Sequence, residues 1–179
     1  MLPEKKSIEA DFELTIARRF LTWLAINGES YLIKDRPNPP DFVFALGGKD
    51  SWLELTDIYL NNEQARFLNR PEEKRFSFFG SPDEPALRLF NKLNEKLSKP
   101  SYRDVFEKLG PGLLLLTCQD IAFDSVNLAR IEEGLYSFCP FDDRGFFKSA
   151  YFEYKIDDQR VYRLVYPRDE AVGSSARSN

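Results

Sequence analysis

Two acidic residues, Asp41 and Glu54, are the side chains of this sequence best suited to chemistry. Asp41 begins a short apolar segment, and Glu54 lies between Leu53 and Leu55 in the next one. The glycine-rich residues 47–50 predict a turn that joins the two segments as a hairpin and brings the two carboxylates near each other. One or two carboxylates, with water and substrate phosphate, are the usual ligands of Mg²⁺, and a metal held in this way can activate water for attack on a phosphodiester.

The same two residues also have a purely structural explanation. Asp41 would cap the start of its strand, while Glu54 would point to water from the strand face that it shares with Trp52 and Thr56. An acid on that face is either solvated or part of a site. Spacing alone leaves both explanations open.

The complete absence of histidine narrows the chemistry. It excludes Ser–His and Cys–His nucleophilic pairs, histidine-ligated zinc and histidine general bases. The two cysteines, Cys118 and Cys139, lack metal-type spacing, and we expect them to be reduced core residues. Any catalysis must therefore use carboxylates, lysines, tyrosines or a hard cation held by oxygen ligands.

Length and composition predict a single domain over residues 1–168, followed by a small, polar and disordered tail over 169–179. No apolar run reaches the roughly 18 residues that a membrane helix needs, and the start of the chain has no signal-peptide pattern, so we expect a cytoplasmic protein without a membrane partner. The net charge of −4 does not by itself indicate nucleic-acid binding, although local basic patches matter more than the total.

Apolar periodicity and turn residues predict a mixed α/β fold, with a central mixed sheet flanked by helices on both faces. The leucine run before Cys118 is apolar on both faces and predicts a central strand. Gly134 is expected to end the predicted helix 125–133. The predicted helices are 7–26, 85–97, 102–109 and 125–133, the predicted strands are 30–33, 40–44, 51–57, 113–118, 146–155 and 161–166, and 63–84 is a predicted long loop.

This order of elements, with Pro40-Asp41 on one strand and Glu54-Leu55-Thr56 on the next, resembles the PD-(D/E)xK nuclease superfamily and its restriction-endonuclease-like fold over roughly residues 7–118. The resemblance implies that Asp41 and Glu54 are catalytic and bind Mg²⁺ or Mn²⁺. It also implies a third acid in the metal shell, which is Glu13 on the first predicted helix or, failing it, Glu9.

The sequence departs from the family pattern at Thr56, where the family has a lysine. The resemblance implies that a lysine of the following helix takes that role, with Lys96 the best placed and Lys92 the next. Such a lysine would act as a point charge near the attacking water or the scissile phosphate. As an alternative, Lys96 is an ordinary surface lysine.

Three functions follow from this departure. The first is a metal-dependent nuclease that hydrolyses DNA. The second is a nuclease-like domain that has lost catalysis and binds nucleic acid or a protein partner, and the third is an α/β interaction module whose acids are merely solvated. The aromatic C-terminal hairpin is a candidate homodimer surface in each case.

Overall fold

The computed structural model describes residues 3–25, 28–58, 84–122, 125–138, 140, 142–156 and 159–167, with the backbone alone described at 3–10, 119–122, 125–127 and 136–137. The predicted tail and the predicted loop at 63–84, apart from its last residue, therefore lie outside the described residues. The elements are α1 (Pro3–Leu24), β1 (Tyr31–Asp35), β2 (Phe42–Leu46), β3 (Lys49–Asp57), α3 (Glu84–Ser98), the 3₁₀ turn η1 (Pro100–Tyr102), α4 (Arg103–Leu109), β4 (Gly112–Ala122), α5 (Ser125–Ser137), β5 (Phe147–Ile156) and β6 (Gln159–Tyr166).

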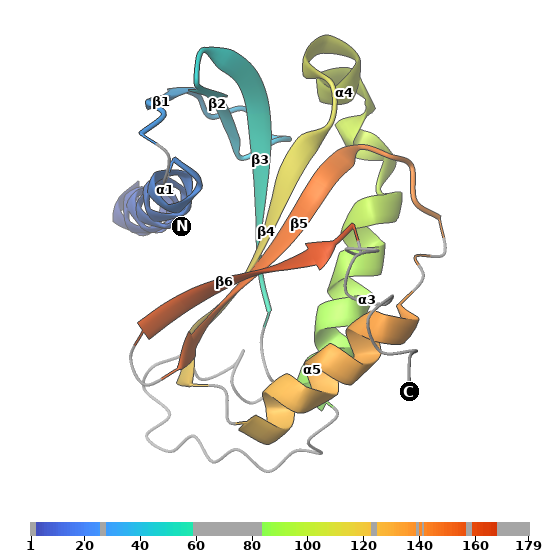
Figure 1. Cartoon of the computed structure of the whole chain (residues 1–179). Coiled ribbons are helices and arrows are strands. Elements are labelled where there is room, and N and C mark those ends of the chain that lie inside the picture. Colours follow the sequence, from blue (N-terminus) through green and yellow to red (C-terminus); the bar gives the residue numbers. More distant parts are fainter. Residues whose placement is uncertain are drawn as a thin grey trace.

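The predicted α/β class is confirmed by a six-stranded mixed sheet in which the strands lie in chain order from β1 to β6 (Figure 1). The first three strands form an antiparallel meander, β3, β4 and β5 run parallel, and β6 returns antiparallel to β5. The leucine-rich strand β4 is an inner strand, as its apolar run predicted. Gly47 and Gly48 form the β2–β3 turn with φ of 56° and 79°, so Lys49 and Asp50 belong to β3 instead of the turn.

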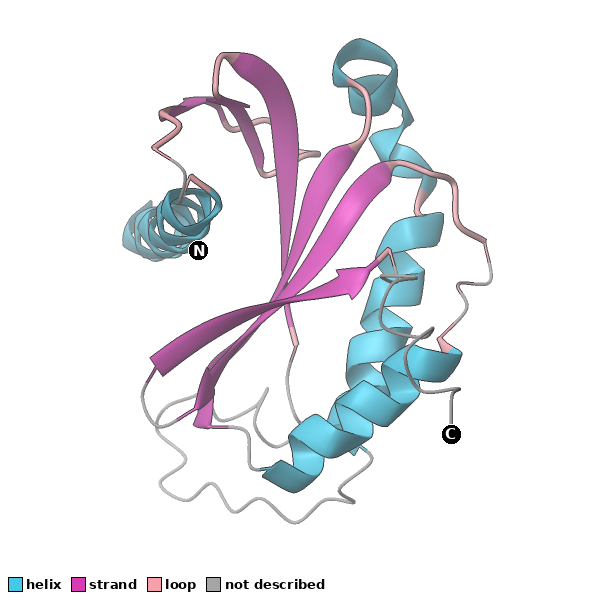
Figure 2. Cartoon of the chain, in the orientation of Figure 1, coloured by secondary structure: helices cyan, strands magenta, loops and turns pink. Residues whose placement is uncertain are grey.

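Helices cover the two faces of the sheet unequally: α1 lies on one face, whereas α3 and α5 lie on the other (Figure 2). Alternation along β3 directs Leu53 toward the α1 side and Trp52 toward the α3 side, where each belongs to a separate buried cluster. Leu113 and Leu114 of β4 divide between the same two clusters. The sheet is therefore the wall between two cores, and Glu54 shares the α3 side with Trp52.

The predicted end of the third long helix at Gly134 is wrong, because α5 continues to Ser137. A Cβ atom at Gly134 would lie 2.2 Å from Cε2 of Phe90 on α3, so glycine is needed here for close helix packing instead of helix termination. Phe90 also stacks on Phe138, with ring centroids 5.2 Å apart. This contact fixes α3, which carries the candidate lysines, against α5.

The first helix begins at Pro3, earlier than the predicted Ser7, and ends at Leu24 instead of Ile26. Proline is well tolerated in a first helical turn because its missing N–H has no partner there in any case. The helix is therefore long enough to cross several strands.

The C-terminal hairpin is confirmed as β5 and β6. Its aromatic residues Phe147, Phe152 and Tyr154 are buried in the chain's own core, so they do not supply the exposed surface from which the homodimer was predicted. The dimer itself stays a prediction. Cys118 is buried in the core, whereas Cys139 lies outside the described residues.

None of the helices within the described ranges combines the length and the apolar character that crossing a membrane requires.

Candidate functional site

Asp41 and Glu54 lie next to each other, where β2 begins and β3 approaches its end. The register pairs Phe42 with Leu53, so the positions that follow in the ladder are those of Asp41 and Glu54. Oδ2 of Asp41 accepts a hydrogen bond from the backbone N–H of Leu55 at 2.7 Å. The two-residue turn therefore brings the two predicted acids together, and Asp41 also caps the sheet ladder.

Glu54 does not face water. It is only 5% exposed, because α3 and η1 cover this face of β3. Its Oε1 accepts hydrogen bonds from the hydroxyl of Tyr102 at 2.8 Å and from Nζ of Lys96 at 2.7 Å. Its Oε2 is buried and has no hydrogen-bond partner among the described residues. The solvated explanation of Glu54 is therefore wrong.

Lys96 lies on the inner side of α3 and is 8% exposed, so the alternative of an ordinary surface lysine is wrong as well. Its ammonium group forms a buried ion pair with Glu54. A lysine is rarely buried without such a partner. The structure thus brings together the acid of β3 and the lysine implied for the following helix.

Asp41 carries an unusual charge environment. The pKa of its carboxyl is raised to about 6, mainly by burial and next by the neighbouring charge of Glu54, while the hydrogen bond from Leu55 and the charge of Lys96 oppose the rise. Glu13 also raises this pKa through its charge. A carboxyl whose ionisation is opposed by a neighbouring carboxylate marks a place where a cation is favourable.

Tyr102 is the site residue that the sequence did not reveal. It is completely buried, and its ring stacks on Trp52 with centroids 5.6 Å apart and meets Phe147 edge-on at 5.1 Å. Burial and the charge of Glu54 raise the pKa of its phenol, so the hydroxyl stays a hydrogen-bond donor. Tyr102 is separated from Glu54 by 48 positions, and no local pattern connects them.

Glu13 takes a peripheral position. Its carboxylate pairs with Arg36 at 2.7 Å, and 46% of its side chain is exposed. Glu13 lines a cleft of about 200 Å³ between α1 and β3. The other lining residues are Phe12, Ile16, Leu55, Thr56 and Asp57.

The three predicted metal ligands Glu13, Asp41 and Glu54 do not form one compact cluster. Within the described part of the chain, no three histidine, cysteine or acidic side chains gather in a group that could hold a metal ion. The pairing of Glu13 with Arg36 is one physical reason, because it neutralises the helix acid away from Glu54. The residues that the structure brings together are Asp41, Glu54, Lys96 and Tyr102.

The remaining candidates lie around this group. Thr56 is buried on the same face as Glu54, two residues further along β3. Lys92 lies one helical turn before Lys96 and pairs with Glu95 at 2.7 Å. Glu9 belongs to α1, but its side chain lies outside the described ones.

A second cleft, of about 530 Å³, is lined by one side of α3 from Glu84 to Glu95, including Lys92, and by Asp57 and Ile58 at the end of β3. This cleft and the one beside Glu13 both border Asp57, at the end of β3. Asp57 accepts a hydrogen bond from the hydroxyl of Thr117. Among the described residues, the two clefts therefore meet at the end of β3, three positions after Glu54, and neither is lined by Asp41 or Glu54.

The donor set suits a hard divalent cation. Both acids offer carboxylate oxygens, which Mg²⁺ and Mn²⁺ prefer, and Oε2 of Glu54 is a buried acceptor without a partner among the described residues. An unpaired buried acceptor costs free energy that a ligand would recover. Asp41 and Glu54 therefore fit a metal that completes its shell with water and substrate.

Comparisons with protein-family models, with curated proteins and with solved structures each found no match to this chain.

Proposed function

We propose that this protein is a metal-dependent phosphodiesterase of nuclease type that hydrolyses DNA, with a restriction-endonuclease-like core formed by α1, β1–β3, α3 and β4. The observation that carries the proposal is the convergence of Lys96 on Glu54 beside Asp41. Without Lys96, the site would hold Asp41 and Glu54 beside Thr56, with no lysine for a phosphate. With it, one buried site holds the acids and the charge that phosphodiester hydrolysis needs.

Each residue has a distinct task in the proposed reaction. Asp41 and Glu54 would hold Mg²⁺ or Mn²⁺, which would supply an activated water and a positive charge for the leaving oxygen. Lys96 provides a fixed positive charge toward the attacking water or the scissile phosphate. Asp41 must be ionised to bind the metal, so metal affinity should fall as the pH drops below about 6.

A second function is favoured by one specific feature, the complete engagement of Oε1 of Glu54. Tyr102 and Lys96 both donate to it inside the core, and such an arrangement also suits an ion pair that only stabilises the fold. In that case the chain is a nuclease-like domain without catalysis that binds nucleic acid or a protein partner.

Metal titration and cleavage assays separate the two functions. The purified protein should bind Mn²⁺ in a calorimetric titration and cleave single- or double-stranded DNA with Mg²⁺ or Mn²⁺. Glu54→Gln should lower both metal affinity and cleavage at least about 100-fold, since it removes a ligand and not an outer contact. Glu107→Gln, at an exposed position of α4, is the matched control and should change neither.

A folded wild-type protein that neither binds Mn²⁺ nor cleaves DNA or RNA with either metal would contradict the nuclease proposal. Retained binding to nucleic acid in that case would support the non-catalytic domain.

A further inference from the structure

The hydrogen bonds of Glu54 are distributed unevenly over its two oxygens. Tyr102 and Lys96 both donate to Oε1, while Oε2 is buried with no partner among the described residues. Two donors on one oxygen fix the plane and the direction of the carboxylate. They leave Oε2 as the oxygen that a metal would find available.

The two donors differ in whether they can stay hydrogen-bonded to Glu54 throughout the proposed reaction. The proposed task of Lys96 involves the substrate phosphate, so its ammonium group has a competing partner during the reaction. Tyr102 has no such competing partner. Its ring is clamped by Trp52 and Phe147, and Lys99 of the α3–η1 connection lies over it with Nζ 5.5 Å from the ring centroid.

The residues around Tyr102 are tightly packed. Trp52 donates a hydrogen bond from Nε1 to the carbonyl of Gly110 at 2.8 Å, which fixes the indole that stacks on the phenol. A Cβ atom at Gly112 would lie 2.3 Å from this indole, so glycine is required where β4 begins. The hydroxyl of Tyr102 is therefore held in place by packing and not by its hydrogen bond alone.

We propose that Tyr102 is the positioning residue of the site, and that it holds Oε1 of Glu54 so that Oε2 is presented to the metal while Lys96 acts on the substrate. This inference rests on the proposed function. Outer partners of metal-binding carboxylates orient the ligand and typically contribute 10- to 100-fold to metal affinity or activity. Tyr102 acts through Glu54 and does not itself touch the metal or the phosphate.

The test is Tyr102→Phe, which keeps the ring and its packing and removes only the hydroxyl. Affinity for Mn²⁺, measured by calorimetry, should fall by about 10- to 100-fold, and DNA cleavage at subsaturating metal should fall with it. Tyr154→Phe, a buried tyrosine in the same core on β5, is the matched control and should leave Mn²⁺ affinity unchanged. Equal affinity of Tyr102→Phe and wild type would overturn the inference.

A measurement on the wild type covers the case in which Tyr102→Phe fails to fold. With ¹³C-labelled tyrosine, the NMR signal of Tyr102 should shift on addition of Mg²⁺, because its acceptor Glu54 gains a ligand, while that of Tyr154 should not. An unchanged Tyr102 signal at saturating Mg²⁺ would overturn the inference. If the wild type binds no metal at all, the proposed function fails first, and this outcome differs from binding that is insensitive to Tyr102.

Discussion

Two buried glutamates on opposite faces of the sheet invite comparison: Glu54 on β3 and Glu153 on β5. Glu153 is only 1% exposed, and its Oε1 contacts Arg19 at 2.6 Å, Arg160 at 3.2 Å and the hydroxyl of Tyr162 at 3.2 Å. Its Oε2, like that of Glu54, is buried without a partner among the described residues. In both glutamates, Oε1 therefore contacts a tyrosine hydroxyl and at least one cationic side chain, while Oε2 has no partner among the described residues.

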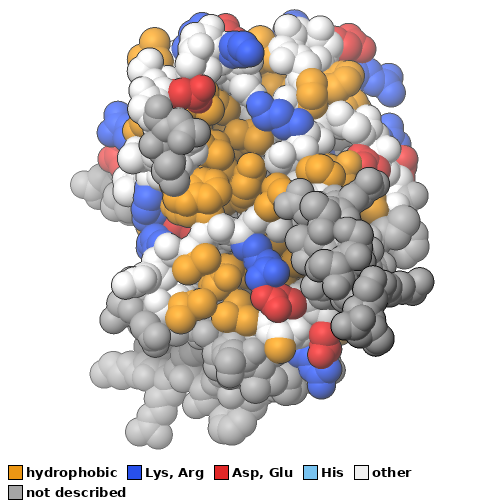
Figure 3. All heavy atoms as spheres, viewed as in Figure 1, with side chains coloured by type: hydrophobic (Ala, Val, Ile, Leu, Met, Phe, Trp, Pro, Cys, Tyr) orange, Lys and Arg blue, Asp and Glu red, His pale blue; other side chains and the backbone are white. Residues whose placement is uncertain are grey.

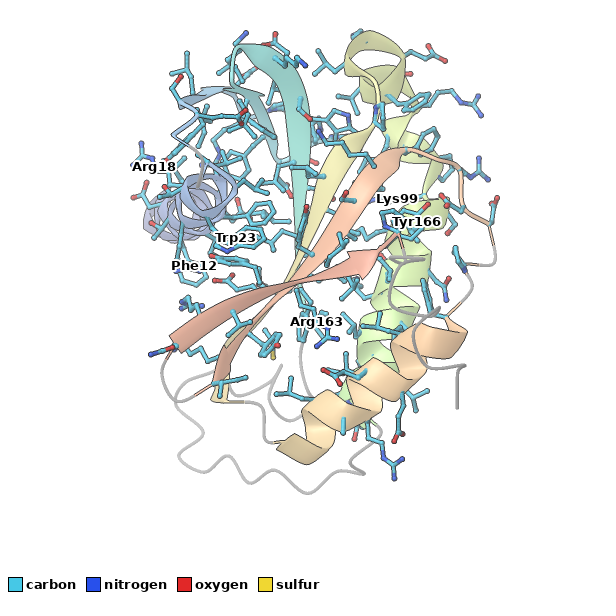
Figure 4. The ribbon with its side chains drawn as sticks, viewed as in Figure 1. Phe12, Arg18, Trp23, Lys99, Arg163 and Tyr166 are labelled. Atoms are coloured by element: carbon cyan, nitrogen blue, oxygen red, sulfur yellow. The ribbon has the colours of Figure 1, made fainter. Side chains whose placement is uncertain are left out.

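The Glu153 cluster belongs to the contact between α1 and the C-terminal hairpin. Arg19 reaches it from α1, and Trp23, one turn further along the helix, packs on Tyr162 with ring centroids 4.9 Å apart. Trp23 lies between α1 and the sheet in Figure 4. Hydrophobic side chains gather between α1 and β6 on the same face in Figure 3. The cluster anchors the helix to the sheet.

The balance of charge distinguishes the two clusters. Glu153 is matched by two guanidinium groups, so positive charge is in excess. Glu54 shares one lysine with the nearby Asp41, whose pKa is raised to about 6, so negative charge is in excess. A divalent cation would reduce the excess negative charge around Glu54, whereas the excess positive charge around Glu153 would repel it. An unpaired buried oxygen is therefore not enough to indicate a metal site, and the neighbouring charges decide.

The largest expected effect comes from removing the cation of each cluster. Lys96→Met leaves Glu54 buried without its ion-pair partner and should lower the free energy of unfolding by about 3–5 kcal/mol. Arg19→Met should cost only about 1–2 kcal/mol, because Arg160 remains on Glu153 and both guanidinium groups are partly exposed. Urea denaturation measures both, and equal losses would contradict the comparison.

The second-largest expected effect is a gain in the free energy of unfolding, and it comes from Asp41. The pKa of Asp41 is about 6 in the folded protein and 3.8 ordinarily, so between about pH 4 and 6 the folded state binds more protons, and stability falls as the pH rises through this window. Asp41→Asn cannot lose a proton and should be more stable than wild type at pH 7, by about 1–2 kcal/mol after discounting for partial exposure, with no gain below about pH 4.

Urea denaturation as a function of pH checks this prediction. Glu153→Gln is the comparison, and it should be less stable than wild type at pH 7, because it removes the charge that two arginines share. A destabilised Asp41→Asn at neutral pH would contradict an excess of negative charge at the site.

The smallest effect separates the two tyrosines. Tyr162→Phe removes the hydroxyl that donates to Glu153 and accepts from Arg19, and should lower the free energy of unfolding by about 1 kcal/mol. It should leave Mn²⁺ affinity unchanged, in contrast to Tyr102→Phe. A calorimetric titration beside urea denaturation tests both parts, and weaker Mn²⁺ binding by Tyr162→Phe would show that the two clusters are not independent.

The sequence by itself determined much of the local structure. The glycine pair and the alternation of β3 predicted the hairpin, the approach of Asp41 to Glu54, and the face that Glu54 shares with Trp52. These features depend on turns and on a period of two, both of which are encoded within a few residues. The helical spacing of 85–97 predicted α3, and the leucine run predicted the inner strand β4 in the same way.

Only the tertiary structure decided which side chains meet. Lys96 and Tyr102 lie 42 and 48 positions from Glu54, and Arg19 lies 143 positions from Tyr162. A family resemblance, and not residue spacing, indicates Lys96, and no feature of the sequence indicates Tyr102. The rotation of a helix about its axis and the side of the sheet that it covers are set by packing, as at Gly134 against Phe90, and no short stretch of sequence contains that information.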